Sequence, residues 1–231
     1  MKKIIILFFL CSIIQAKAGQ TVEESSSGNL SLSKITHRQD GLILNFTSDG
    51  WLTLPANITT KPLSSRGFAF YLMGEKMTPK GNIGLGYGLG ISSMNVSSNG
   101  FFDDYTNSDK TLLHAYPDSI DYDINKISLN YLDLALELRF RTNENESHKR
   151  FKFSVGAKGG WLFQDHMKFK NGKDKSKVYN LDHLNDFQYG LTARIGYGKW
   201  ALNGYYGLAG IFEKNKGPEL IPFSVGISIT P

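Results

Sequence analysis

The stretch that decides the fold runs from Phe151 to Phe163 and reads FKFSVGAKGGWLF. Large apolar side chains alternate in it with lysine, serine and glycine. Because successive side chains of a β-strand point to opposite faces, this alternation predicts a strand with one apolar face and one polar or very small face. The stretch has 13 residues, which exceeds the usual strand of a soluble protein, whereas a tilted membrane strand needs about 9 to 11 residues.

The same alternation recurs along the chain from about residue 41 onward. It predicts eight strands, at about 41–50, 66–76, 82–97, 123–141, 151–167, 187–198, 200–212 and 222–230. In the segment 123–141 the apolar positions change phase once, from Leu129 and Tyr131 to Leu132 and Leu134. An extra residue in the strand produces such a change, so we expect a β-bulge near Tyr131.

The connections between these strands alternate in length. Long connections are expected at 51–65, 98–122, 168–186 and 213–221, and short ones at 77–81, 142–150 and around Lys199. A soluble sandwich has no reason to sort its loops in this way, whereas a barrel that crosses an outer membrane has tight turns on the periplasmic side and long loops outside. The expected fold is therefore all-β, an eight-stranded antiparallel up-and-down transmembrane β-barrel.

The apolar faces would point inward in a soluble, lipocalin-like barrel and outward in a membrane barrel. The aromatic residues favour the membrane barrel, because many lie near strand ends and ring side chains prefer the headgroup level of a bilayer. The expected aromatic girdle comprises Phe151, Phe153, Trp161, Phe163, Tyr189, Tyr197, Trp200 and Phe212.

The opposite faces are rich in glycine and carry a few charged residues. We expect a charge network in the barrel interior made of Glu137, Arg139, Lys152, Lys158 and Arg194. The interior of an eight-stranded barrel is just wide enough for its own side chains, so small residues and paired charges fit there. The evenly spaced glycines at 84–90 would leave room for inward neighbours such as Arg139 or Arg194. A conducting pore is not expected.

Residues 1–18 combine a basic start, an apolar stretch of 11 residues and a small-residue pattern at the end, which predicts a cleaved signal peptide. Residues 19–40 are polar, rich in serine and without periodicity, so we expect a flexible periplasmic lead-in before a barrel at 41–231. The predicted location is the cell outer membrane. The only cysteine, Cys11, would leave with the leader, which excludes disulfides and zinc–thiolate sites from the mature chain.

Composition excludes several classes of protein. Apolar content of 41% is too high for an intrinsically disordered chain. A mean hydropathy of −0.25 is too low for a polytopic helical membrane protein. The formal net charge of +5 would fall to +2 with the loss of Lys2, Lys3 and Lys17, so a nucleic-acid partner is not expected.

Candidate reactive groups are sparse. The five histidines fall in the lead-in, loops, a turn or a strand tip, and we interpret them as solvated. A lipid-modifying barrel enzyme would need a histidine and a serine close together at the outer rim of the barrel. His166 is expected near this rim, but no serine flanks it in its strand. The aspartate-rich loop at 98–122 matches no calcium-binding spacing. No catalytic residue, metal or cofactor is therefore expected.

The third long loop has the opposite charge. Its lysines alternate with other residues around the turn dipeptide Asn171-Gly172, and they are Lys168, Lys170, Lys173, Lys175 and Lys177. Ammonium groups act as point charges toward phosphates. One interpretation is therefore that these lysines contact phosphates of lipopolysaccharide, and the alternative is that they form an ordinary solubilising loop.

Four strand patterns carry a resemblance to a known family: GLGYGLG at 84–90, LNYLDL at 129–134, FSVGAKGGW at 153–161 and YGLTARIGY at 189–197. With them, the chain from about Gly81 to Pro231 resembles the PorT-like outer-membrane β-barrel family of Bacteroidota-type bacteria. The resemblance implies an outer-membrane barrel and, as one role, an accessory of a protein export or gliding apparatus. The chain departs from other outer-membrane barrels in ending Ile229-Thr230-Pro231, where those usually end in an aromatic residue.

These observations predict a small non-enzymatic outer-membrane barrel whose loops mediate surface or envelope interactions. Its expected partners are outer-membrane lipids, lipopolysaccharide and envelope proteins. Two alternatives stay open, the export or gliding accessory and a lipid A-modifying enzyme. The specific ligand and the oligomeric state do not follow from the sequence.

Overall fold

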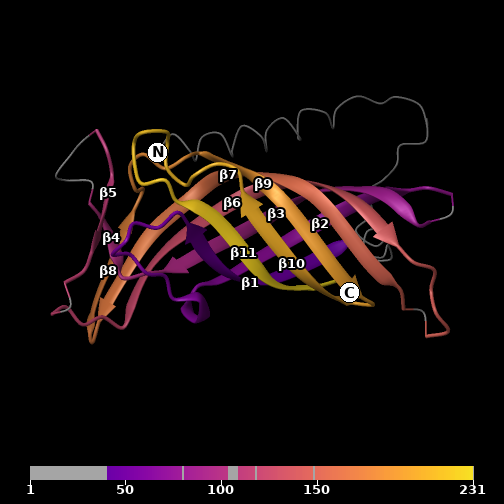
Figure 1. The fold of residues 1–231 in the computed structure, drawn as a ribbon, viewed down its shortest axis with the longest axis horizontal. Coiled ribbons are helices and arrows are strands. Elements are labelled where there is room, and N and C mark those ends of the chain that lie inside the picture. The colour runs from indigo at the N-terminus through magenta and orange to yellow at the C-terminus, as the bar shows by residue number, and fades with distance from the viewer. Residues whose placement is uncertain (1–40, 80, 104–108, 118, 148, 231) are drawn as a thin grey trace, which may run out of the picture.

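The computed structural model describes residues 41–79, 81–103, 109–117, 119–147 and 149–230. The predicted signal peptide and lead-in lie outside these residues. The described chain consists of antiparallel β-strands and one 3-10 helix, arranged as an elongated body (Figure 1). None of the described residues forms a helix that is long and apolar enough to cross a membrane.

The described residues contain eleven strands. Their bounds are β1 Leu42–Leu52, β2 Arg66–Met77, β3 Ile83–Ser97, β4 Gly100–Asp103, β5 Leu112–Ala115, β6 Ile124–Arg141, β7 Phe151–Asn171, β8 Asp174–Tyr179, β9 Phe187–Tyr197, β10 Trp200–Gly207 and β11 Ile221–Ile229, and the 3-10 helix η1 spans Pro62–Ser64.

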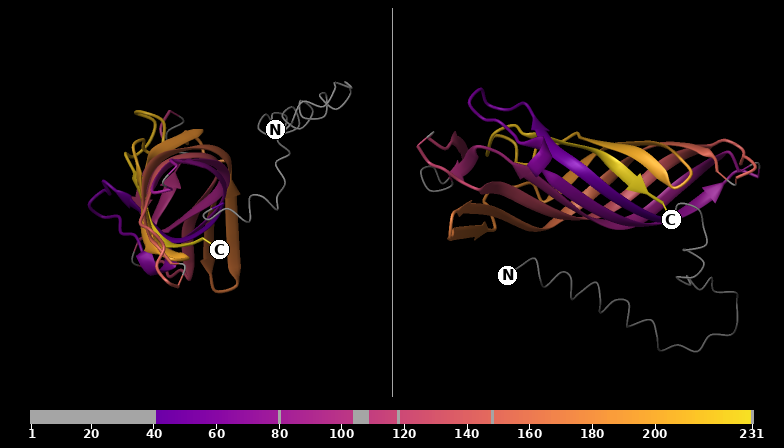
Figure 2. Two further views of the ribbon diagram at one scale, coloured as in Figure 1. Left: turned by 90° about the vertical axis from the view of Figure 1, so that its right-hand side faces the viewer. Right: turned by 90° about the horizontal axis from the view of Figure 1, so that it is seen from below.

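Eight of these strands form a ring in which each strand pairs with two other members. The order is β6-β3-β2-β1-β11-β10-β9-β7, and a further pairing of β6 with β7 joins the two ends of that order. The pairings therefore run round a ring, which the end-on view in Figure 2 shows enclosing an interior. Strand β8 pairs with the far part of β7, and β4 pairs with β5 in a separate two-stranded sheet.

Each of the eight strands expected from the sequence has a counterpart in this ring. The expectation for 200–212 is too long, because β10 ends at Gly207. Two hairpins lie where only loops were expected, β4–β5 within 98–122 and the β7–β8 hairpin within 168–186. The second one turns at Asn171-Gly172, where Gly172 has a φ of +55°, a left-handed conformation that glycine adopts without strain.

The ladder between β6 and β7 is irregular beside Tyr131, but the extra residue is on the partner strand. Asn130 pairs with Gln164 and Tyr131 pairs with Leu162, so Phe163 is left without a partner on β6. The irregularity expected near Tyr131 is therefore present, but its extra residue lies on β7 and not within 123–141. Odd-numbered residues of β6 face inward along its whole length, and what changes near Tyr131 is which of the two faces is apolar.

The outward faces of the ring strands are apolar, whereas the inward faces combine polar and charged side chains with buried apolar clusters. Leu134 is 65% exposed and Val225 is 60% exposed on the outside, whereas Asp133 and Arg139 are 1% and 2% exposed on the inside. A soluble, lipocalin-like barrel would show the reverse arrangement. Together the outward side chains form an apolar belt, which on β7 runs from Phe151 to Phe163.

The largest buried apolar cluster lies at the end of the ring that carries the long loops. It contains Trp51, Met94, Val96, Phe102, Ile127, Leu129, Tyr131, Leu162, Leu181, Leu184, Ile211, Phe212 and Leu220. The members come from strand ends and from the loops that follow them, so this cluster, called the apolar plug below, packs the loops against the ring.

Candidate functional site

Charged side chains form one connected network inside the ring, near its short-turn end. The Arg139 guanidinium lies 3.0 Å from a Glu75 carboxylate oxygen and 3.2 Å from a Glu137 oxygen. Arg141 is 2.5 Å from Glu75, and Arg194 is 2.8 Å from Glu137. Their side chains are nearly buried, and each charge faces an opposite charge, which offsets part of the free-energy cost of placing them away from water.

The structure thus brings together three of the five residues expected in the charge network, Glu137, Arg139 and Arg194. Lys152 lies beside them and donates to the Thr230 hydroxyl at 3.4 Å. Sequence reasoning missed Glu75 and Arg141. Arg141 shares the face of Arg139 two residues earlier, which is a signal that could have found it, whereas Glu75 lies at the end of a strand with weak alternation.

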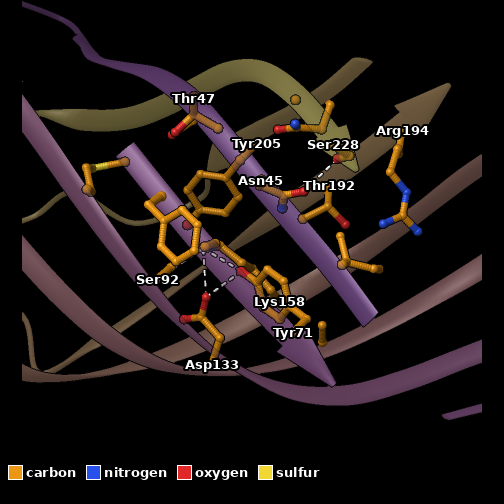
Figure 3. A pocket seen from close by; sticks show the side chains of 18 of the residues that line it. Asn45, Thr47, Tyr71, Ser92, Asp133, Lys158, Thr192, Arg194, Tyr205 and Ser228 are labelled. Carbon is orange, nitrogen blue, oxygen red and sulfur yellow. Dashed lines mark hydrogen bonds and ion pairs between the residues drawn. The ribbon is translucent and has the colours of Figure 1, made fainter. Parts of the chain in front are cut away.

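Lys158 belongs to a second, separate group in the middle of the ring. Its Nζ lies 3.0 Å from Asp133 Oδ2, which also accepts a hydrogen bond from the Tyr71 hydroxyl at 2.6 Å. The ammonium group lies 4.5 Å from the centre of the Tyr205 ring and 3.4 Å from Ser92 Oγ. Figure 3 shows these side chains converging from strands on different sides of the interior.

This group lines an interior cavity of about 80 Å³. Among the described residues, Asp133 Oδ1 and Asn203 Nδ2 are buried polar atoms of its lining without a hydrogen-bond partner. Buried polar groups in a space of this size are commonly satisfied by ordered water. The cavity therefore suits a few water molecules better than a large ligand.

Both ends of the cavity are closed by side chains. The charge network lies on the short-turn side. On the other side the apolar plug contributes Leu129 and Leu162, each 1% exposed, and the ring of Phe102 packs 5.3 Å from that of Phe212. Within the described residues, the interior is therefore divided into layers and does not form an open channel.

The expected girdle residues lie at two levels of the apolar belt. Phe151 pairs with Tyr197, which pairs with Trp200, at the short-turn end. At the opposite end, Trp161 pairs with Phe187. Of the expected girdle, Phe151, Phe153, Phe163, Tyr189, Tyr197 and Trp200 are between 39% and 60% exposed, and Trp161 is partly exposed.

Phe212 does not belong to this girdle. It is 5% exposed, lies beyond the end of β10 and packs inside the apolar plug. Its placement on a membrane-facing strand end is wrong because the loop after Gly207 folds back over the ring opening, held by the isolated bridge between Leu184 and Phe212.

The loop lysines lie on a hairpin and not on an irregular loop. Lys168 pairs with Lys177 and Lys170 pairs with Lys175 across the β7–β8 hairpin, and Lys173 lies in its turn region. Lys170 Nζ is 3.0 Å from Asp123 Oδ2. The hydrogen bond from Lys170, followed by the attraction of its charge, lowers the pKa of Asp123 from its ordinary value.

The structure supplies a serine that the sequence pattern did not place. Ser128 of β6 is directly opposite His166 of β7. However, Ser128 is 2% exposed and its hydroxyl donates to Asn95 Oδ1 at 2.5 Å. Burial, followed by the nearby Lys177 and Lys126, lowers the pKa of His166, which favours its neutral form.

Two of the aspartates that the structure describes in and beside the second long loop have separate partners. Asp103 lies 3.9 Å from the His114 ring, and Asp123 is paired with Lys170. In the ranges that the structure describes, no three histidine or carboxylate groups are arranged to hold a metal ion.

Comparison with known protein families identifies a match. The family model described as "Outer membrane protein beta-barrel domain" matches residues 36–213, which is more than half of the chain and includes seven strands of the ring. No curated protein and no solved structure shows a significant match. With its outward apolar belt, its polar interior and this match, the chain belongs to the outer membrane protein β-barrel domain family.

Proposed function

We propose that this chain is a non-enzymatic, non-conducting barrel of eight strands that spans the outer membrane up and down and is exported through a cleaved leader at residues 1–18. Its long-loop end would face outward and mediate contacts at the cell envelope. The observation that carries the proposal is the apolar belt around an interior in which buried arginines are paired with carboxylates.

The dimensions of the belt support a membrane-spanning position. From Phe151 to Phe163 the strand extends about 40 Å at roughly 3.3 Å per residue, and a tilt of about 45° reduces its height to about 28 Å. The apolar band of outer-membrane barrels is about 25 Å tall. Aromatic side chains lie at both ends of this span, where they match the two headgroup levels.

The layered interior supports the absence of a pore. An ion that crossed the ring would have to displace the buried Arg139–Glu75 pair and then the apolar plug around Leu162. Neither layer contains a continuous path of exposed polar groups among the described residues.

Two measurements test this proposal. The chain, refolded into detergent micelles, should migrate differently on a gel before and after boiling, and in a planar bilayer it should produce no discrete conductance steps. An unchanged gel band would contradict a closed barrel. Regular conductance steps would contradict the sealed interior while leaving the barrel intact.

The export or gliding accessory is the alternative that the PorT-like resemblance suggests. It requires partner binding at the short-turn end, where residues 142–147 are polar and exposed. Within that turn Asn145 Oδ1 accepts hydrogen bonds from the Ser147 and Lys149 amides, so the turn presents a fixed polar surface. A pull-down from a detergent extract that loses its captured proteins when 143–147 are replaced by Gly-Ser would favour this alternative.

The lipid A-modifying enzyme has one observation in its favour, the opposed pair of Ser128 and His166. Hydrolysis would require the serine hydroxyl to leave Asn95 and donate to the imidazole. Mass spectra of lipid A from cells with and without the gene decide the matter, because identical spectra exclude the enzyme and a lost acyl chain supports it.

A further inference from the structure

Five lysines share one face of the sheet that rises above the apolar belt. Lys126 on β6 pairs with Lys168 on β7, and Lys168 pairs with Lys177 on β8. Lys170 pairs with Lys175 one step further along the hairpin. Since directly opposite residues of an antiparallel pair point to the same side, these five side chains form a single basic face.

The irregularity at Phe163 decides that this face points outward. Before it, even-numbered residues of β7 such as Leu162 point into the ring. After it, odd-numbered residues such as Asp165 point inward and the even-numbered lysines point outward. If the alternation of β7 continued unchanged past Phe163, Met167 and Phe169 would point outward and the lysines inward.

The positive charge of the basic face is only partly compensated. Like charges directly opposite one another on a sheet destabilise it. Lys170 pairs with the carboxylate of Asp123, whereas Lys126 donates to the neutral Asn95 side chain at 3.2 Å. Burial, followed by Lys168 and Lys177, lowers the pKa of Lys126, as expected where positive charges crowd together.

The other side of the hairpin holds it in place. Phe169 packs against Tyr116 and Tyr122, with ring centres 5.1 Å and 6.1 Å apart, and Phe101 packs on Tyr116 at 4.7 Å. The Gly172 amide also donates to Asp123 Oδ2 at 3.2 Å. The lysines therefore project from a supported sheet and not from a free loop, which lowers the entropic cost of binding an anion.

The height of the basic face matches the layer of lipid headgroups. On the same outward face of β7, Phe163 belongs to the aromatic level and Lys168 follows five residues later, about 16 Å along a tilted strand and therefore about 12 Å higher. Long lysine side chains can reach back toward the interface. Anions at this height in an outer leaflet are the phosphates of its glycolipids.

We propose that Lys126, Lys168, Lys170, Lys175 and Lys177 bind the phosphate groups of a lipid A-type glycolipid beside the barrel. This rests on the proposed membrane-spanning function and deepens it by naming a ligand. The binding is electrostatic, so it weakens as salt screens the charges.

The test compares two triple variants of the full chain in detergent micelles. Lys126→Gln/Lys168→Gln/Lys177→Gln removes the row across three strands, and Lys149→Gln/Lys214→Gln/Lys216→Gln removes the same charge from exposed positions elsewhere. Each protein is titrated with diphosphorylated lipid A, with dephosphorylated lipid A and with inorganic phosphate. The first variant should bind diphosphorylated lipid A at least tenfold more weakly than the wild type, and the control variant should bind it unchanged.

Each outcome has a distinct meaning. Equal binding by both variants, or equal binding of dephosphorylated lipid A, would overturn the basic face as a phosphate site. Inorganic phosphate that competes at the same concentration as lipid A would overturn the glycolipid as its source. If the first variant loses its heat-dependent gel shift, it has not folded, and the inference is tested on the wild type instead. Binding of lipid A to the wild type that is unaffected between 50 and 500 mM salt would then overturn the inference. Loss of that shift in the wild type would count against the membrane barrel itself.

Discussion

Arg139 occupies the space that a side chain on Gly86 would need. A Cβ at residue 86 would lie 2.5 Å from Arg139 Nε and 2.8 Å from its Cζ. The two residues are on neighbouring paired strands, where Gly86 is opposite Glu137. The glycine therefore gives the guanidinium room to reach Glu75 and Glu137 at the same time.

Replacing Gly86 by leucine should destabilise the barrel by about 1–3 kcal/mol, because overpacking forces the buried guanidinium away from its carboxylates. The measurement is the urea concentration at which the heat-dependent gel shift is lost. Gly159→Ala is the control, since an added Cβ there meets nothing within 4 Å. Equal midpoints for the two variants would show that Arg139 has another position available.

Glu75 forms ion pairs with two arginines. Replacing it by glutamine should lower the free energy of unfolding by about 3–5 kcal/mol, as expected when one partner of a buried ion pair is removed. Arg139 and Arg141 would keep their positive charges and lose the carboxylate that both contact. Urea unfolding of the refolded protein measures the loss.

Glu146→Gln, in the exposed short turn, is the matched control and should leave the unfolding midpoint unchanged. Adding Arg141→Met to Glu75→Gln should recover part of the loss, because one uncompensated charge disappears. If the double variant unfolds at a lower urea concentration than Glu75→Gln alone, Glu75 is not the carboxylate that the two arginines share.

The positions of the strands could be predicted from the sequence, because alternation with period two shows that the two faces of a segment differ in polarity. The eight ring strands are expected from such patterns as Phe151 to Phe163. The pattern of β6 was misleading for a physical reason. Its inward face is apolar at Leu129, inside the plug, and polar at Asp133, beside the cavity, so an apolar residue does not always mark the same side of the strand.

The interior partners and the plug depended on long-range packing. Glu75 meets Arg139 only because β2 and β6 both flank β3 in the ring. Phe212 resembles a girdle residue in sequence, yet the loop that carries it folds inward onto Phe102. The β7–β8 hairpin was missed because its lysines resemble a solvated loop, although the Asn171-Gly172 turn was visible.

Deleting Phe163 should leave the basic face pointing outward. The deletion removes the extra residue of β7, so Gln164 would follow Leu162 directly and keep Asn130 as its partner, and Lys168 and Lys170 would keep their outward positions. We expect unchanged lipid A binding and unchanged proteolysis at Lys173, measured by titration and by timed digestion with trypsin. Phe163→Ala, which keeps the extra residue, is the control and should also bind normally. A tenfold loss of binding by the deletion variant alone would contradict this register.

Acidification should loosen the β7–β8 hairpin through His166. The pKa of His166 is lowered by burial and by Lys177 and Lys126. An unfolded histidine titrates near 6.5, so as the pH falls below that value the open hairpin takes up a proton that the closed one resists, and stability is lost. Tryptic cleavage at Lys173 should be faster at pH 5.5 than at pH 7.5 after correction for the enzyme's own pH dependence. His166→Gln should remove the difference; if the difference persists in that variant, another group is responsible.

Replacing Leu136 by arginine tests whether the apolar belt faces lipid or is an ordinary surface exposed to water. Leu136 is 54% exposed near the middle of the outward face of β6, opposite Ala157 and Tyr87. At the midplane of a bilayer Leu136→Arg should cost about 2–4 kcal/mol, whereas in water an exposed charge would cost almost nothing.

Asn130→Arg is the control, because it lies on the same outward face beyond the belt and pairs with Gln164. Unfolding midpoints in phospholipid vesicles should therefore fall for Leu136→Arg and stay constant for Asn130→Arg. Equal midpoints for both variants would mean that the belt does not contact acyl chains, since only a hydrocarbon environment penalises a charge at one of these two positions and accepts it at the other.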